Sequence, residues 1–374
     1  MPDVGVFAVE DTAVQVCWRG LPVGTTISLG DASVQVTAER PGAATLAGLP
    51  AATRLELLVR RPGSHEARRS GAVRTLAPPP GELLCRFATV NDLHLGERRF
   101  GLLRMIHDEP GTGLEPYPLR CARAALEEAV AWGAEAVVAK GDLTYHGRPR
   151  QWADLARLLA GVGVPVVAVL GNHDVGPRAV DGRPTLAAHG ITVPHDPFSL
   201  DLPGVRIVLA HTAVAHKHHG AVLGRQRDQL ADLLADAPGP AFLAMHHYVQ
   251  RFGVPLAYPP GVPGDQSRAL LDAVVAANPA TLVSAGHTHR NRRRTHGPLV
   301  LTEVGATMHY PGTWAGYAVH EGGIRQVVRR VATPDAIEWT DRTRRALLGG
   351  WGAIAPGFRS HRCFSHTWPS RLPS

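Results

Sequence analysis

The stretch V-L-G-N-H-D-V, residues 169–175, places a glycine, an amide, an imidazole and a carboxylate at the end of an apolar run. Taken alone, it could be a turn or a helix cap, because Gly, Asn and Asp tolerate unusual backbone angles and bond to their own main chain. Whether it carries chemistry depends on how the other apolar runs of the chain end.

Five short apolar runs end in residues of the same kind. The runs are F-A-T-V (87–90), A-V-V-A (136–139), V-P-V-V-A-V-L (164–170), F-L-A-M (242–245) and T-L-V-S-A (281–285). The groups that follow are N-D-L-H, K-G-D, G-N-H-D, H-H and G-H-T-H. Helical patterns separate many of the runs, at 119–132, 150–159, 225–234 and 267–277. This alternation predicts an α/β chain, in which polar groups at the carboxyl ends of strands can meet in one crevice.

A metal site explains these endings better than separate local roles do. A single Asp or His after a strand is ordinarily a helix cap or a solvated side chain. Five endings in series are different, because buried carboxylates and polar atoms without partners are costly and a cation removes that cost. Oxygen and nitrogen ligands without thiolate suit Mn, Fe or Zn, and the sequence does not choose among them.

The ordered series D-x-H, G-D, G-N-H-D, H and G-H-x-H resembles the signature of the calcineurin-like metallophosphoesterases, over about residues 83–320. The resemblance implies a four-layer αββα sandwich with two metal ions and a bridging hydroxide that attacks a phosphoester. The implied ligands are Asp92, His94 and His289 for one metal, Asn172, His246 and His287 for the other, and Asp142 as the bridge between them. In this arrangement Gly171 is expected to let the chain turn sharply.

Other histidines are expected to support the ligands. The resemblance implies that His173 contacts the phosphate or protonates the leaving oxygen, and we expect Asp174 to fix the tautomer of this ring and to raise its basicity. Of the pair H-H, the family pattern favours His246 as the ligand and leaves His247 as a contact behind it or to the substrate. By its position, His309 is also expected to line the pocket.

Tyr145, in G-D-L-T-Y, bears on the subgroup. G-D-x-x-Y resembles the purple acid phosphatases, whose tyrosine binds ferric iron and whose catalytic domain follows a β-sandwich. That group usually has glycine at the position of His94, and a histidine there makes a tyrosine ligand redundant. We therefore expect Tyr145 to pack behind the ligands and favour the cyclic-nucleotide and glycerophosphodiester type of phosphodiesterase. A purple acid type of phosphomonoesterase and a non-catalytic metal-binding scaffold are the alternatives.

The residues before the catalytic region have a different hydrophobic pattern, without the alternation of strands and helices. Short alternating apolar runs separated by L-P-V-G and R-P-G predict the strands of a small β-sandwich. Trp18, the phrase L-A-G-L-P-A-A-T (46–53) and the exit T-L-A-P-P-P (75–80) resemble a fibronectin type III-like domain. The fold predicted for the chain is thus an αββα metallophosphoesterase sandwich with a small N-terminal β-sandwich. The predicted divisions are a β-sandwich at 1–77, a proline-rich linker at 78–82, a catalytic domain at 83–331 and a C-terminal extension at 332–374, to which we assign no structure.

Composition limits the partners. The 374 residues carry a formal charge of +7, and only 6% of them are aromatic, which argues against an aromatic and basic nucleic-acid surface. We place the one dense basic run, R-N-R-R-R at 290–294, beside an anionic substrate. A small phosphoester is therefore the expected partner, and the sequence gives no oligomeric state.

Location is predicted from the signals that the sequence lacks. No apolar run is long enough to span a membrane, the start has no secretory pattern, and the four cysteines form no C-x-x-C pair. These features predict a cytoplasmic protein with reduced thiols.

Overall fold

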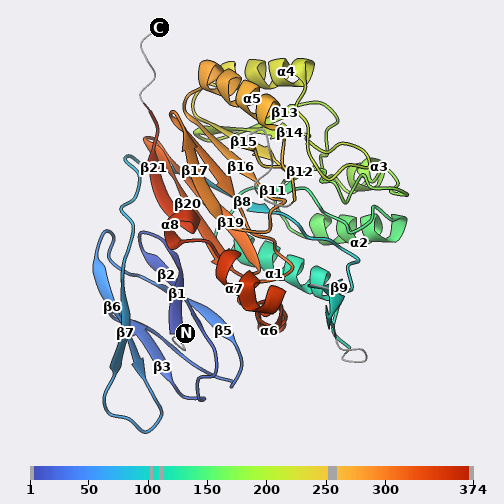
Figure 1. The fold of residues 1–374 in the computed structure, drawn as a ribbon. Helices are drawn as coiled ribbons and strands as arrows, with labels where there is room; N and C mark the ends of the chain where they lie inside the picture. The colour runs from blue at the N-terminus through green and yellow to red at the C-terminus, as the bar shows by residue number, and fades with distance from the viewer. Residues whose placement is uncertain (1–3, 102–103, 109–112, 252–258, 370–374) are drawn as a thin grey trace.

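The computed structural model describes residues 4–101, 104–108, 113–251 and 259–369 of the chain. Two six-stranded β-sheets pack face to face at its centre, with helices over the outer face of each sheet (Figure 1). Two smaller sheets, built from the N-terminal residues, lie to one side. The predicted αββα sandwich with an N-terminal β-sandwich is therefore confirmed.

The first central sheet has the strand order β12-β11-β8-β19-β20-β21. Its strands are β8 (Leu83–Val90), β11 (Val137–Lys140), β12 (Val166–Val169), β19 (Thr313–His320), β20 (Gly323–Arg330) and β21 (Cys363–Thr367). β8, β11 and β12 are mutually parallel, and the remaining strands are antiparallel to their neighbours. β12 reads V-V-A-V and is buried along its whole length, as a parallel strand covered on both faces should be.

The second central sheet has the strand order β13-β14-β15-β16-β18-β17. Its strands are β13 (Phe198–Leu202), β14 (Val205–Ala210), β15 (Ala241–Met245), β16 (Thr281–Ala285), β17 (Arg292–His296) and β18 (Leu299–Glu303). The four inner strands are parallel, and β13 and β17 pair antiparallel at the two edges. The two sheets share a core, in which the rings of Phe87 and Phe242 meet edge to face at 4.9 Å.

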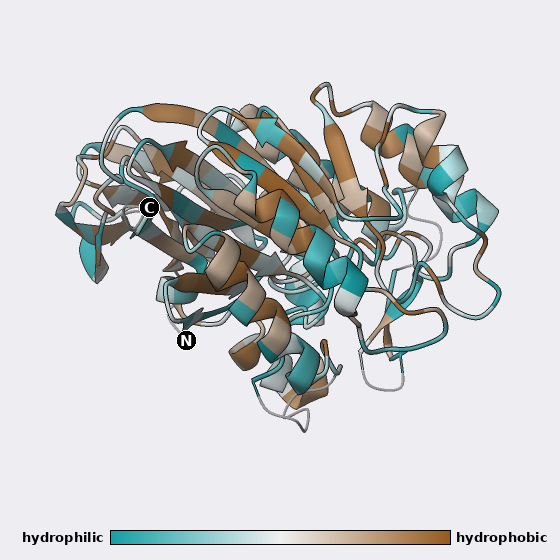
Figure 2. Cartoon of the chain, turned by 90° about the horizontal axis from the view of Figure 1, so that it is seen from above, coloured by the Kyte–Doolittle hydropathy of each residue, from teal (hydrophilic) through white to brown (hydrophobic). Residues whose placement is uncertain are grey.

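Helices cover the outer faces of both sheets. The first sheet carries α1 (Tyr117–Ala131) and α2 (Pro149–Ala160), with α3 (Arg183–Ala187) beside α2, and the second carries α4 (Gly224–Ala235) and α5 (Gly264–Ala277). The buried residues of α5 include Leu270, Leu271 and Val274, a helical spacing that forms one apolar face. Figure 2 shows the resulting layering, with hydrophobic central strands and mixed surfaces on the helices. The four predicted helices are confirmed.

The N-terminal residues form the sheets β1-β2-β5 and β4-β3-β6-β7. The strands are β1 (Val4–Val9), β2 (Ala13–Trp18), β3 (Thr26–Leu29), β4 (Ala32–Gln35), β5 (Gly42–Ala47), β6 (Arg54–Arg60) and β7 (Arg68–Arg74). Their core includes Val16 and Ile27, and it continues into Val327 and Cys363 of the first central sheet. The small sandwich is thus packed against the larger one.

Residues 332–369, for which the sequence predicted no structure, form short helices and one strand. They form α6 (Pro334–Thr343), the 3-10 turn η2 (Leu347–Gly349), α7 (Gly350–Ile354), α8 (Arg359–Arg362) and β21. A short hairpin of β9 (Arg99–Phe100) and β10 (Ile106–His107) lies near them. Among the described residues, none of the helices is long and apolar enough to cross a membrane.

Candidate metal centre

The candidate ligands lie directly after β8, β11, β12, β15 and β16. These strands belong to two different sheets, so the polar groups meet across the sandwich instead of along the edge of one sheet. The structure therefore brings the predicted ligands together, in two neighbouring groups.

The first group comprises Asp92, His94, Asp142 and His289, whose ligand atoms all lie within 4.8 Å of one another. His289 Nε2 is 3.2 Å from Asp92 Oδ1, and His94 Nε2 is 3.5 Å from Asp142 Oδ2. Both carboxylates are buried, with side-chain exposures of 0% and 2%. Four ligand atoms thus converge in a water-poor interior.

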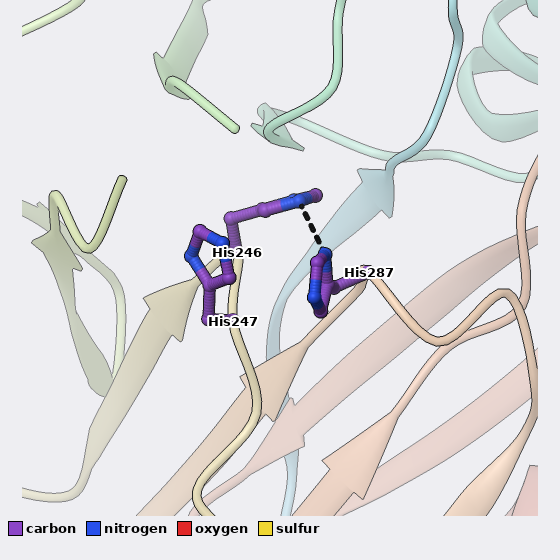
Figure 3. Close-up of side chains that lie close together, drawn as sticks. All are labelled: His246, His247 and His287. Carbon is purple, nitrogen blue, oxygen red and sulfur yellow. Dashed lines mark hydrogen bonds between the residues drawn. The ribbon is translucent and has the colours of Figure 1, made fainter. Parts of the chain in front are cut away.

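The second group is centred on His246. Its Nε2 lies 3.3 Å from Asn172 Oδ1 and 3.2 Å from His287 Nδ1, as Figure 3 shows for the two rings. The same nitrogen is 3.4 Å from Asp142 Oδ2. One oxygen of Asp142 therefore faces both groups.

Two of these histidines are oriented by backbone carbonyls. Nδ1 of His246 lies 2.8 Å from the carbonyl oxygen of Lys140, and Nε2 of His287 lies 3.1 Å from that of Pro260. A ring nitrogen facing a carbonyl carries the proton, so the other nitrogen of each neutral ring keeps a free lone pair. In both rings the free lone pair points into the second group.

The backbone at the ligands is strained. Eleven described residues other than glycine have a positive φ, and five of them are Asp92, His94, Asp142, His287 and His289. The left-handed conformation costs such residues of order 1–3 kcal/mol each and is typically found where function requires it. The sequence did not predict this clustering, because side-chain pattern carries little information on φ.

Three glycines let the ligand loops approach each other. A Cβ on Gly171 would lie 2.2 Å from Asp142 Oδ1, one on Gly141 2.5 Å from His246 Nδ1, and one on Gly286 2.8 Å from Asp92 Oδ2. Gly171 was expected to permit a sharp turn, but its φ lies outside the left-handed region. The chain does turn here, since the backbone N–H of Asp174 donates to the Gly171 carbonyl at 3.2 Å, but what requires glycine is the close approach to Asp142.

The role expected for Asp174 is also wrong in its physical detail. Asp174 accepts hydrogen bonds from the backbone N–H groups of Leu143, Thr144 and Gly171, and from the Thr144 hydroxyl, at 2.8–3.0 Å. The carbonyl oxygen of Tyr145 lies 3.0 Å from Nδ1 of His173 and takes the orienting role. Asp174 therefore ties the loop of Asp142 to the loop of His173.

His247 lies closer to the centre than a contact behind His246 would. Its ring groups with those of His246 and His287 (Figure 3), within reach of a common ion. Its Nδ1 is 2.9 Å from the Thr212 hydroxyl, and its buried Nε2 has no hydrogen-bond partner among the described residues. The alternation of side chains along a strand could not predict that His246 and His247 lie together, because adjacent residues of a regular strand point to opposite faces.

Tyr145 and the basic run have protein partners. The Tyr145 ring lies 5.3 Å from the ring of His173 at an interplanar angle of 22°, beside the ligands. Arg294 pairs with Glu303 at 3.2 Å, and the guanidinium of Arg293 lies 3.9 Å from the centre of the Phe364 ring. Arg293 and Arg294 are thus engaged within the protein, and the place of the run beside a substrate stays a prediction.

Electrostatics hold the carboxylates ionised. Burial alone would raise the pKa of Asp92 and Asp142, but the histidines that face them, above all His289 and His246 respectively, lower both pKa values below the usual range. Burial lowers the pKa of His246, but the carboxylates of Asp142 and Asp92 outweigh it and raise that pKa to about 9. Burial and the nearby His246 lower the pKa of His287 to about 3. At pH 7, without metal, His246 is therefore protonated beside Asp142, at the place where a cation would otherwise bind.

The residues present fit a pair of metal ions. Both ring nitrogens of His94 are buried and lack hydrogen-bond partners among the described residues, which is costly in a protein interior. The donors are imidazole nitrogens, carboxylate oxygens and the Asn172 amide, without thiolate, a set that suits divalent first-row metals.

Comparisons with known proteins identify relatives of this chain. The chain is 29% identical over 196 residues to a probable cyclic nucleotide phosphodiesterase of Rhodococcus erythropolis, covering 50% of this chain and 62% of that protein. It is 30% identical over 185 residues to a cAMP/cGMP dual specificity phosphodiesterase of Mycobacterium tuberculosis, covering 46% of this chain and 54% of that protein. The chain thus matches less than two thirds of the length of either relative.

A solved structure and a family model also match. A purple acid phosphatase from yellow lupin seeds aligns with a TM-score of 0.46 at 12% identity, over 89% of this chain and 73% of that one. The model of the family described as calcineurin-like phosphoesterase matches residues 85–291, which is more than half of the chain. The chain belongs to the calcineurin-like phosphoesterase family.

Proposed function

We propose that this protein hydrolyses phosphodiesters at a centre of two metal ions that share Asp142. The observation that carries the proposal is the position of Asp142 Oδ2, 3.5 Å from His94 Nε2 and 3.4 Å from His246 Nε2. Cyclic nucleotides are the first substrate class to test, because both relatives described above are named for them. Glycerophosphodiesters are the second.

Each residue has a defined task in this proposal. Asp92, His94 and His289 would hold one ion, and Asn172, His246 and His287 the other. When bound, the ions would supply an activated water as nucleophile and would neutralise charge on the phosphoryl group. A phosphodiester carries one negative charge, so the centre together with His173 can stabilise its transition state without a further cationic pocket.

His173 is the proposed contact to the phosphate or the leaving oxygen. It is half-buried, its ring centre lies 4.5 Å from that of His94, and its Nδ1 faces the carbonyl of Tyr145. With Nδ1 engaged there, Nε2 is the nitrogen left to meet the substrate. Asp174 would act indirectly, by fixing the loop that carries this ring.

The metals and the location are part of the proposal. The donor set suits Mn, Fe or Zn. A cytoplasmic protein remains our expectation from the sequence.

Purple acid type phosphomonoester hydrolysis is the second candidate. The observation that favours it is G-D-L-T-Y, in which the Tyr145 ring lies 6.0 Å from the ring of His94. A non-catalytic scaffold is disfavoured, because every ligand position of the family is filled in this chain.

The test compares the initial hydrolysis rates of an aryl phosphodiester and the matching monoester, with chelated enzyme restored by manganese. Asp142→Asn is assayed in parallel. A diester preference that disappears in the variant supports the proposal. A monoester preference favours the purple acid type instead, and no metal-dependent turnover of either ester, or of cyclic nucleotides, contradicts the proposal.

A further inference from the structure

His309 lies behind a candidate metal ligand. It is placed between β18 and β19, is fully buried, and its Nε2 is 2.6 Å from Nδ1 of His289. The expectation that His309 lines the pocket is therefore wrong, because His309 faces Nδ1 of His289, whereas Nε2 of His289 faces Asp92 in the first group. Its contact is with the outer nitrogen of that ring.

The protons of the two rings can be assigned from this contact. Nε2 of His289 faces Asp92 Oδ1 at 3.2 Å and is the nitrogen on the side of the first group. If Nε2 is to offer its lone pair to an ion, the neutral ring must carry its proton on Nδ1. The Nδ1–H of His289 then donates to Nε2 of His309.

This assignment leaves His309 with its own proton on Nδ1. That nitrogen is buried and makes no hydrogen bond of good geometry among the described residues, the one backbone group that interacts with the ring being that of Tyr310. An unmet buried donor costs about 1–3 kcal/mol, a cost that an apolar side chain of similar size would avoid. What the imidazole contributes here, and an apolar residue could not, is the acceptor that faces His289.

Aromatic rings from distant parts of the chain hold His309 in place. Phe100, on β9, stacks on its ring with centroids 4.0 Å apart and planes at 26°. Trp351, on α7, packs edge-on with centroids 5.5 Å apart. The ring of His309 is therefore wedged between a hairpin and the C-terminal segment.

The C-terminal segment also fixes the backbone on both sides of His309. Trp339 donates from Nε1 to the Met308 carbonyl at 2.8 Å, and Trp351 donates from Nε1 to the Tyr310 carbonyl at 2.9 Å. The backbone N–H of Tyr310 donates to the Thr343 hydroxyl at 2.7 Å. Three side chains from residues 339–351 thus fasten the loop that carries the acceptor.

We propose that His309 is a positioning residue that fixes the tautomer and ring orientation of His289, and that the C-terminal segment serves the metal centre by holding His309. The proposal rests on the proposed function, since it takes His289 to be a metal ligand. Groups that orient a ligand histidine in this way typically change metal affinity about 10–100-fold when they are removed.

The test uses two variants of nearly equal shape. His309→Gln can keep an oxygen acceptor near the position of Nε2, whereas His309→Met fills the same space without a comparable acceptor. Manganese binding to the full-length, chelated protein is measured by titration calorimetry, and thermal unfolding of each metal-free variant checks the fold. We expect His309→Met to weaken one of two manganese sites about 10–100-fold and His309→Gln to retain most of the wild-type affinity.

The outcomes separate this inference from the proposed function. If the wild-type protein binds two ions and His309→Met binds both as tightly, the positioning role is wrong while the metal centre stands. Equal losses in the two variants would also overturn it, because packing alone would then explain the effect. A wild-type protein that binds no metal would overturn the proposed function and this inference together.

Discussion

Replacing Gly171 with alanine is expected to disrupt the metal centre while the fold persists. The added Cβ would lie 2.2 Å from Oδ1 of Asp142 and 2.3 Å from its backbone nitrogen, whereas ordinary contact begins at 3.4 Å. The carboxylate can rotate away, but the backbone nitrogen cannot. The two loops must therefore separate by about 1 Å, the difference between 3.4 and 2.3 Å.

That displacement sets the size of the effect. A misplacement of about 1 Å at a reacting centre can lower the rate about 10²-fold. Overpacking of a tight interior also lowers the free energy of unfolding by about 1–3 kcal/mol. Because Asp142 faces both groups of ligands, we expect both ions to bind more weakly.

Gly176→Ala is the matched control. Gly176 lies five residues further along the chain, and a Cβ there would meet only the carbonyl oxygens of Asn172 and His173, each at 3.8 Å. Manganese affinity and the rate on an aryl phosphodiester are measured for both variants, with thermal unfolding as the check on folding. Wild-type affinity and rate in Gly171→Ala, or equal losses in the two variants, would refute the reasoning.

Three further predictions concern proton release on metal binding, the visible spectrum of the iron-loaded protein and the contribution of Asp174 to stability. The carboxylate of Asp142 overcomes the effect of burial and raises the pKa of His246 to about 9, so at pH 7 metal binding should release a proton, and affinity should rise as the pH approaches 9. Calorimetry in two buffers of different ionisation enthalpy measures this release, and binding heats that do not depend on the buffer would contradict it. Tyr145→Phe should leave the visible spectrum of the iron-loaded protein unchanged, whereas a band that the variant abolishes would identify the purple acid type. Asp174→Asn should lower the free energy of unfolding by about 1–3 kcal/mol, because its amide N–H would face backbone donors. The pH–rate profile should keep its shape, and a shifted profile would restore the direct role of Asp174 on His173.

Much of the fold and of the site could be predicted from sequence because both depend on strand ends. Apolar runs such as V-V-A-V at 166–169 are buried on both faces, so their position and their parallel arrangement follow from composition. The polar residues that follow these strands then lie close together, because the carboxyl ends of the parallel strands meet in one region of the sandwich. Asp92, Asp142 and His246 are at the predicted positions for this reason.

The remaining features depend on contacts that no local pattern encodes. The contact of His309 with His289 joins loops on either side of β17 and β18, and its support comes from Trp351 in a segment without a clear period. α6 has 10 residues and buries Ala336, Ile337 and Thr340 at helical spacing, but α7, which carries Trp351, has only 5 residues and is too short for a periodic pattern. The partners of Asp174 were missed because its oxygens bind backbone groups, whose positions only the folded loops define.

The central claim is that two ions share Asp142, and the electron paramagnetic resonance spectrum of the manganese-loaded protein tests it most directly. Two Mn²⁺ ions joined by a carboxylate lie close enough for their spins to couple. We predict a coupled spectrum with two ions per chain in the wild-type protein, and loss of that coupling in Asp142→Asn. Two uncoupled ions in the wild type, or coupling that survives in Asp142→Asn, would contradict the account.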